Sequence, residues 1–278
     1  MPELPEIQAH AERLDEDFRG ATLQRFEPLS FSVLKTFSPD PASAAGTDVT
    51  RVHRRGKYVL IELAPITFVV HLMQGGRLRP DDKQSAKPRG GVARWRFDDG
   101  RALLLTEPGT ERKAGVWVVD GDPTDQVPLQ GLGPDADRIT RDEIAERLAA
   151  NSGRVHGFLR DQHPMAGVGR RLSNEILHRA QLSPFANTKK LTDDEVDRLH
   201  AALAALIEES LVFERAQDEM VKSADRPGAV HNRIGEECPV CGDTVRSVEY
   251  RRYTVAYCPT CQTGGKVLAD NTTSKFLR

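Results

Sequence analysis

The sequence lacks any apolar run of about 18 residues, and it has almost no excess of charge. We therefore expect no transmembrane helix. The first residues also lack the basic region and apolar stretch of a secretory signal. The expected compartment is the cytoplasm, where thiols stay reduced. Lysine and arginine (39) nearly balance aspartate and glutamate (41), so the net charge of −2 neither indicates nor excludes a nucleic-acid partner. Any anionic ligand must be bound by local basic clusters.

Three such clusters are present. They are RVHRRGKY at 51–58, GRRLSNE with Arg170 and Arg171, and EYRRY with Arg251 and Arg252. Each is either a solvated basic face or a phosphate contact, and composition alone leaves both alternatives open.

The chain has no internal repeat, and its hydrophobic pattern changes along its length. Apolar residues at helical spacing predict a helix over 5–19, which Gly20 ends. Short β-prone runs then predict a sandwich or barrel: TLQRFEPL, KYVLIEL, ITFVVHL, GVARWRF, RALLLT and GVWVVD. A stretch rich in Pro, Gly and Asp follows. Beyond it, the capping boxes Thr140/Glu143 and Thr192/Glu195 predict helices.

The sequence thus predicts an α+β protein. We expect an N-terminal helix and β-sandwich domain over 1–122 and a linker over 123–137. A helical domain over 138–222, a cysteine module over 223–264 and a flexible tail over 265–278 should follow.

Cysteine is scarce: the chain has four, all in two C-x-x-C pairs. The pairs are Cys238 with Cys241 and Cys258 with Cys261, and sixteen residues separate them. Each pair can give two thiolates to one tetrahedral ion, so we expect one structural Zn²⁺ in a zinc ribbon or finger. Two disulfides are the alternative, which the missing secretory signal disfavours. A closed four-sulfur site leaves no open coordination position, so this zinc folds the module and does not catalyse.

The first residues, MPELPE, have two interpretations. Proline with the acids Glu3 and Glu6 suits the start of a helix. Alternatively, removal of Met1 exposes the secondary amine of Pro2. An α-amine has a pKa of about 8 against about 10.4 for lysine, so on the order of one in ten is unprotonated at pH 7. Such an amine can attack a sugar aldehyde carbon and form an iminium, whose positive charge promotes elimination of a neighbouring phosphate.

Five motifs follow one another along nearly the whole chain: MPELPE, RRGKY, HLMQGGRL, AGVGRRLSNEILHRAQLSP and the C-x2-C-x16-C-x2-C end. In this order they resemble the formamidopyrimidine-DNA glycosylase/endonuclease VIII family. The resemblance implies a β-sandwich domain, a helix-two-turn-helix domain and a zinc finger. It also implies a base-excision repair enzyme that flips a damaged nucleotide out of double-stranded DNA. Such an enzyme is a DNA glycosylase with AP lyase activity, whose N-terminal proline forms a Schiff base before β,δ-elimination cuts the strand.

The resemblance assigns roles to individual residues. Pro2 is the nucleophile, Glu3 is the proton donor and acceptor, and Glu6 supports the site from the same helix. Lys57 matches a lysine that holds a phosphate next to the lesion, which a point charge on a β-turn can do independently of sequence. The implied partner is damaged duplex DNA in the nucleoid, and we expect a monomer.

Two phosphate-contact positions depart from the family pattern. Arg170 stands where the helix-two-turn-helix loop has asparagine, and arginine binds phosphate in a different geometry. Tyr253 stands where the zinc finger has arginine. Arg252 is one step away, on the opposite face of a strand, whereas Arg251 lies on the face of Tyr253 and can substitute.

The residues that fill the space left by the flipped base also differ. In HLMQGG, Gln74 takes the position of a methionine in the 8-oxoguanine branch, and Met73 comes one residue early. Ala114 takes the position of a phenylalanine, and Arg112 or Lys113 remains to reach the partner base. The segment VKSADRPGAV is short for a loop that closes over 8-oxoguanine. We therefore expect a preference for abasic sites, oxidised pyrimidines or ring-opened purines.

The sequence does not decide the roles of four further residues. His71 ends an apolar run and is either structural or a phosphate contact. We expect Trp95 and Trp117 in the core. Glu175 either orients the loop GVG at 167–169, which we favour, or complements the helix dipole.

The function also has an alternative. A protein of the same architecture with weak or no catalysis could bind damaged DNA or abasic sites. The intact Pro2, Glu3 and Lys57 favour the enzyme, because a pure binding protein has no use for a free secondary amine.

Overall fold

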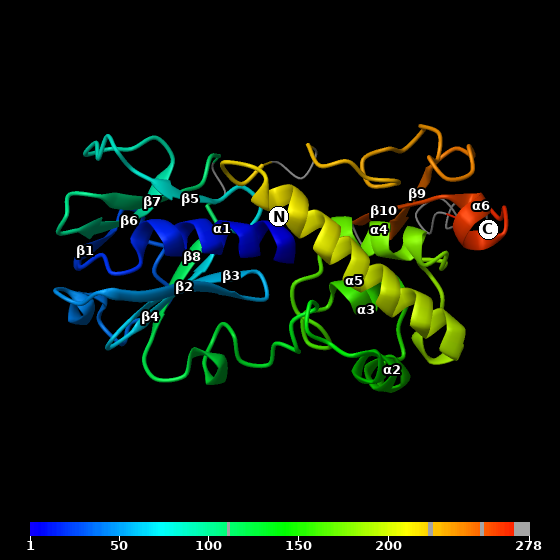
Figure 1. The fold of residues 1–278 in the computed structure, drawn as a ribbon, viewed down its shortest axis with the longest axis horizontal. Helices are drawn as coiled ribbons and strands as arrows, with labels where there is room; N and C mark the ends of the chain where they lie inside the picture. The colour runs from blue at the N-terminus through cyan, green and yellow to red at the C-terminus, as the bar shows by residue number, and fades with distance from the viewer. Residues whose placement is uncertain (110–111, 222–224, 251–252, 270–278) are drawn as a thin grey trace. The chain divides into compact units, whose positions relative to one another are not determined.

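The computed structural model describes residues 1–109, 112–221, 225–250 and 253–269. The chain divides into two compact units, Met1–Gly131 and Leu132–Arg278 (Figure 1). Their boundary falls within the range 123–137 that we assign to the linker; the finer division of the chain remains a prediction. No helix among the described residues is long and apolar enough to cross a membrane.

Two antiparallel four-stranded sheets form most of the first unit and confirm the α+β class. One sheet has the order β1-β6-β7-β5 and the other the order β2-β3-β4-β8. The elements are α1 (Leu4–Phe18), β1 (Leu23–Pro28), η1 (Pro41–Ala44), β2 (Val49–Arg55), β3 (Tyr58–Leu63), β4 (Thr67–His71), β5 (Arg77–Pro80), β6 (Gly91–Phe97), β7 (Ala102–Thr106), β8 (Gly115–Val119) and η2 (Pro123–Asp125).

Every β-prone run of the sequence contains a strand, but β2 and β5 were not predicted. Both lie at the edges of their sheets and are rich in charge, with the sequences VTRVHRR and RLRP. Charged side chains on an edge strand hinder pairing with other chains. They also remove the apolar signal by which a strand is recognised. The basic cluster at 51–58 therefore lies on the hairpin of β2 and β3.

The core of this unit contains aromatic side chains from both sheets. The ring of Trp95 on β6 lies 5.0 Å from that of Phe26 on β1 and 5.7 Å from that of Phe68 on β4. Trp95 is fully buried, as expected, whereas Trp117 on β8 is only half-buried. Helix α1 packs against β2 and β3 with a buried apolar face that includes Ile7 and Leu14. This packing fixes the start of α1 in the unit.

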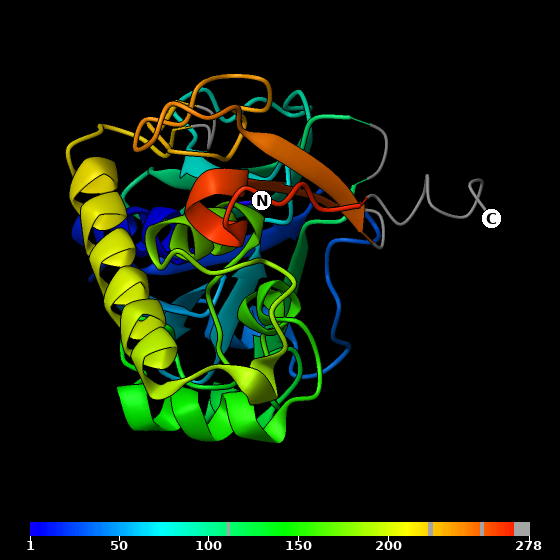
Figure 2. The ribbon, with the colours of Figure 1, turned by 90° about the vertical axis from the view of Figure 1, so that its right-hand side faces the viewer.

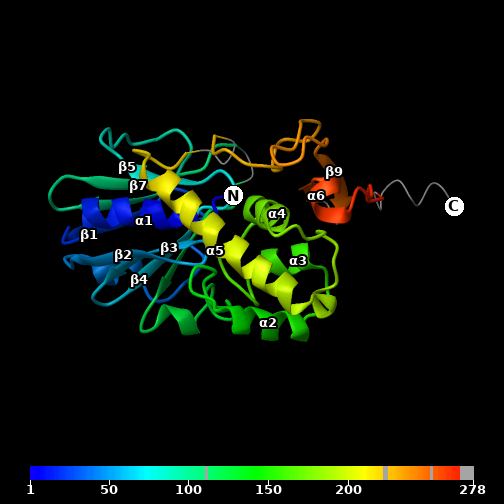
Figure 3. The same cartoon turned by 45° about the vertical axis from the view of Figure 1, so that its right-hand side comes forward.

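Helices and a small hairpin form the second unit (Figures 2 and 3). Both predicted capping boxes are formed, at the starts of α2 and α5. Helix α4 packs against α3, α5, β10 and α6, so it joins the helices to the cysteine module. The elements are α2 (Arg141–Ala150), α3 (Val155–Arg160), α4 (Arg170–Arg179), η3 (Thr188–Lys190), α5 (Asp193–Arg215), β9 (Arg246–Tyr250), β10 (Tyr253–Tyr257) and α6 (Pro259–Thr263).

Candidate functional site

The N-terminal residues separate into a helix start and a residue outside it. Glu3 is the N-cap of α1, and its backbone N–H donates to the Glu6 carboxylate at 3.1 Å within a capping box. Pro5 is the proline of the first helical turn. Pro2 precedes the cap and is buried, as are Glu3 and Glu6. The helix-start interpretation thus applies to Glu3, Pro5 and Glu6 and leaves Pro2 without a role in the helix.

Lys57 lies in the two-residue turn between β2 and β3. Gly56 at the first turn position has a φ of 56°, as a type II′ hairpin turn requires. The turn leaves Lys57 only 9% exposed. His71, at the end of β4, pairs in register with Tyr58, and the two rings lie 4.6 Å apart.

The pKa of His71 is lowered by burial and by two positive charges. Burial, together with the positive charges of Lys57 and of the amine of Met1, lowers the pKa of His71 from 6.5 to about 4. Lys57 precedes Tyr58, which pairs with His71, so the hairpin places Lys57 near the imidazole, and the amine of Met1 adds a second positive charge that acts on the same ring.

A hydrogen bond fixes the state of the His71 imidazole. The backbone N–H of Met73 donates to His71 Nδ1 at 3.0 Å, so in the neutral ring the proton is on Nε2. Met73 has a φ of 52°, and a Cβ on Gly76 would lie 2.2 Å from the Leu72 carbonyl oxygen. This tight turn leaves Met73 half-buried and Gln74 exposed.

Arg112 is exposed in the loop between β7 and β8. Glu107, which the sequence analysis did not single out, holds the base of this loop. Its buried carboxylate accepts from the Ala114 backbone N–H at 2.7 Å, and its own N–H donates to the Gly90 carbonyl at 2.8 Å. Ala114, at the position of the family's phenylalanine, is buried.

In the second unit, Arg170 is the first residue of α4 and is exposed. The preceding loop is held by Gln162, whose side chain donates to the Val168 carbonyl and accepts from the Gly167 N–H, both at 2.9 Å. The N-terminus of a helix attracts anions, and Arg170 adds a full positive charge there. The other predicted contacts, Arg251 and Arg252, lie outside the described residues.

Our expectation for Glu175 was wrong. Its buried carboxylate does not hold the loop at 167–169. It accepts instead from the backbone N–H groups of Ala229, Val230 and His231, at 2.7, 3.1 and 2.7 Å. Such a carboxylate fixes a segment that is more than fifty residues away in sequence.

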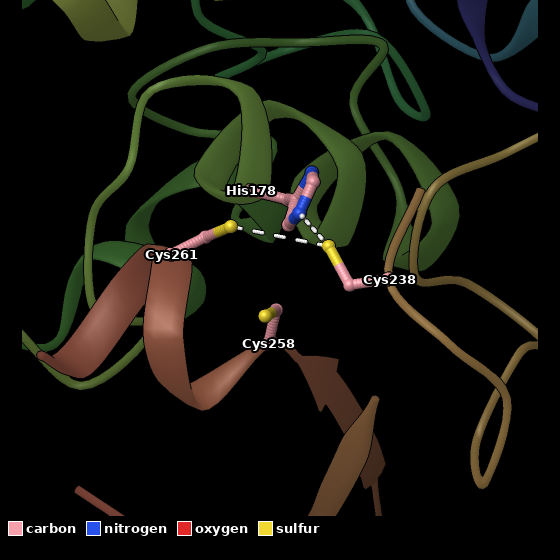
Figure 4. Close-up of side chains that lie close together, drawn as sticks. All are labelled: His178, Cys238, Cys258 and Cys261. Atoms are coloured by element: carbon pink, nitrogen blue, oxygen red, sulfur yellow. Dashed lines mark hydrogen bonds between the residues drawn. The ribbon is translucent and has the colours of Figure 1, made fainter. Parts of the chain in front are cut away.

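The four cysteine sulfurs form one cluster. Sγ of Cys238 lies 3.9 Å from that of Cys261, and Sγ of Cys241 lies 3.4 Å from that of Cys258. With zinc–sulfur bonds of about 2.3 Å, two sulfurs of a tetrahedral site lie about 3.8 Å apart, so the cluster fits one zinc ion. His178, on α4, also reaches the cluster, and its Nε2 lies 3.3 Å from Cys238 Sγ (Figure 4). The sequence analysis missed this histidine.

Comparison with known proteins agrees with the fold. Family models match residues 1–117, as a formamidopyrimidine-DNA glycosylase N-terminal domain, and residues 131–220, as the H2TH domain of the same glycosylase. A formamidopyrimidine-DNA glycosylase of Symbiobacterium thermophilum is 31% identical over 94% of this chain and 89% of its own length. The chain belongs to the formamidopyrimidine-DNA glycosylase family.

Further relatives of this glycosylase-family chain extend the comparison. An uncharacterised formamidopyrimidine-DNA glycosylase-like protein of Mycobacterium tuberculosis is 44% identical over 54% of the chain and 96% of its own length. The Lactococcus lactis glycosylase, solved bound to DNA with an AP site, has a TM-score of 0.83 at 20% identity, over 94% of this chain and 99% of its own. Another structure of that protein, with DNA containing an oxidised pyrimidine, has a TM-score of 0.85 at 20% identity, over 94% and 100%. At this identity the two structures support the fold alone.

Proposed function

We propose that this chain is a bifunctional DNA glycosylase/AP lyase of base-excision repair that uses the amine of Pro2. The observation that carries the proposal is that Lys57 and the amine of Met1, the residue before Pro2, both act as positive charges on the buried His71, in a chain of this family. Pro2 is not needed for the helix, since Glu3 caps it and Pro5 occupies its first turn. A buried proline before the cap is thus available for chemistry once Met1 is removed.

The reaction would begin at the anomeric carbon of the damaged nucleotide. The Pro2 nitrogen forms a bond to that carbon, the bond to the base breaks, and ring opening gives an iminium. Loss of a proton from the adjacent carbon then expels the 3′ phosphate, and a second elimination expels the 5′ phosphate. Glu3 would carry the protons, and Glu6, through its hydrogen bond to the Glu3 N–H, would hold Glu3 in place.

Positive charge near the amine suits the phosphates of the substrate. Lys57 would bind the phosphate next to the lesion as a point charge. The protonated Nε2 of neutral His71 offers a further donor. Arg112 and Arg170 are exposed cations that would contact the strand.

We propose a preference for abasic sites, oxidised pyrimidines and ring-opened purines over 8-oxoguanine. Related Lactococcus lactis structures contain an AP site, an oxidised pyrimidine and Fapy-dG. In this chain an exposed Gln74 and a buried Ala114 take the places of the methionine and phenylalanine of the 8-oxoguanine branch. Neither can act as the large apolar wedge that replaces a flipped purine.

One structural zinc ion would be held by Cys238, Cys241, Cys258 and Cys261. When bound, it supplies the link that folds the two C-x-x-C turns into one module. The reacting groups we propose lie in the first unit, so a monomer acting on duplex DNA in the nucleoid suffices.

Borohydride trapping tests the proposal. The protein is mixed with a duplex that holds one abasic site, reduced, and compared with Pro2→Gly and with a form that retains an extension before Pro2. We expect a covalent adduct that mass spectrometry maps to Pro2 and that the extended form lacks. Tight binding without adduct or cleavage would contradict the proposal and favour the alternative, a binding protein for damaged DNA.

A further inference from the structure

The four thiols of the cysteine cluster differ in their exposure. Cys238 and Cys258 are buried, Cys261 is partly buried, and Cys241 is exposed. Cys238 and Cys258 belong to a small apolar core against which Cys261 packs. Cys241 is therefore the ligand that solvent and small reagents reach most easily.

His178 approaches the cluster from the helical side. Its ring nitrogen and the sulfurs of Cys238, Cys258 and Cys261 all lie within 4.8 Å of one another (Figure 4). Cys241 is not a member of this group. The imidazole thus lies against the three less exposed sulfurs, and these four side chains have the composition of a second tetrahedral site, with three sulfurs and one nitrogen.

Hydrogen bonds join the cysteine module to the segment that follows α4, the helix that carries His178. Gln262 accepts from the Cys258 backbone N–H and donates to the Leu182 carbonyl, which follows α4, both at 2.9 Å. Helix α4 also packs directly against β10 and α6. His178 is buried. A buried imidazole whose nitrogen already lies 3.3 Å from a ligand sulfur needs little motion to become a ligand.

We propose that His178 is a reserve zinc ligand, which takes the fourth position when the thiolate of Cys241 is lost. With all four thiolates on the metal, the Nε2–H of His178 donates to Cys238 Sγ. When Cys241 is lost, the proton moves to Nδ1 and the free electron pair of Nε2 binds the metal. The number of protons on the ring is unchanged, and the ion stays four-coordinate. The inference depends on the zinc site that we propose, but not on the reaction with DNA.

Zinc content provides the test, since it does not depend on activity. Full-length wild type, Cys241→Ala, His178→Leu and the double variant are purified and their zinc is measured after dialysis against a chelator. We expect one zinc per chain in the wild type and in both single variants, but loss of zinc in the double variant. Zinc should leave the double variant at least about 10-fold faster than Cys241→Ala.

The ligand itself is identified by spectroscopy. In the Co²⁺-substituted protein, the visible bands of Cys241→Ala should move to shorter wavelength than those of the wild type, because nitrogen exerts a stronger ligand field than thiolate. X-ray absorption of the zinc form should show imidazole scattering in Cys241→Ala and none in the wild type.

Three results would overturn the inference. A Cys241→Ala chain that loses zinc, or does not fold in excess zinc, shows that His178 does not replace the thiolate. Equal retention in Cys241→Ala and the double variant shows that the fourth ligand is another group. A wild type without zinc would refute the zinc proposal itself, which separates that failure from the other two.

Discussion

His71 should make the first unit less stable at mildly acidic pH. In the unfolded chain its pKa is near 6.5, whereas in the folded chain burial and two neighbouring cations lower the pKa to about 4. As the pH falls from 7 to 5, the unfolded state binds a proton that the folded state does not, so acid favours unfolding. The contribution of the neutral imidazole to the free energy of unfolding is fully present above the pKa of His71 in the unfolded chain, and it is lost as the pH falls toward 4. For these two pKa values, linkage gives a loss of about 2 kcal/mol between pH 7 and pH 5.

The two tryptophans allow this loss to be measured in one unit alone. The chain contains only Trp95 and Trp117, and both lie in Met1–Gly131, so fluorescence follows the unfolding of the first unit. Urea unfolding at pH 7, 6 and 5 is compared between the wild type and His71→Asn. The Asn side-chain oxygen can still accept from the Met73 N–H, but it cannot be protonated.

We expect the wild type to lose about 2 kcal/mol more than His71→Asn over this range. His10, whose pKa burial also lowers to about 4, destabilises both proteins equally and cancels in the comparison. His163→Asn is the control, since the side chain of His163 is 81% exposed and lies in the other unit. An equal loss in the wild type and in His71→Asn would refute the assignment of a neutral, buried His71.

Three further predictions concern Glu175, Lys57 and the cysteine module. Glu175→Ala leaves three backbone N–H groups without their acceptor, which should lower the free energy of unfolding of the second unit by about 3 kcal/mol. The control is Glu208→Ala, at an exposed position, which should change this free energy by less than about 0.5 kcal/mol. Equal effects of the two substitutions, in urea unfolding followed by far-UV circular dichroism, would contradict this role of Glu175. Lys57→Met keeps the aliphatic part of the side chain but removes the charge, so fluorescence anisotropy should show about 10–100-fold weaker binding to an abasic duplex and a smaller salt dependence of binding. The control is Lys87→Met, at an exposed position, which should bind the duplex as the wild type does. An equal loss of affinity in the control would indicate a general charge effect. Removal of zinc by a chelator should increase hydrogen exchange in the cysteine module and leave the unfolding of the first unit, followed by tryptophan fluorescence, unchanged. A module whose amides stay protected from exchange without metal would be evidence against a structural ion.

The sequence was sufficient wherever the signal is local. The two C-x-x-C pairs predicted one cluster, because two residues between cysteines already place both thiols on one turn. Both capping boxes were predicted for the same reason, since their partners are three residues apart. The edge strands β2 and β5 were missed because charged side chains hide the apolar alternation of a strand.

Tertiary structure decided the partners of buried polar groups. Glu175 holds backbone groups at least 54 residues away, and His178 reaches a sulfur 60 residues away. The pKa of His71 falls to about 4 because folding buries the ring where the charges of Lys57 and of the amine of Met1 act on it, so His71 stays neutral at mildly acidic pH. Periodicity and spacing describe a residue and its neighbours along the chain, whereas burial and long-range contacts arise only when separate elements pack. The sequence by itself therefore determined the family, the elements other than the charged edge strands, and the cysteine cluster. Only the packed structure determined the lowered pKa of His71 and the presence of His178 at the cysteine cluster.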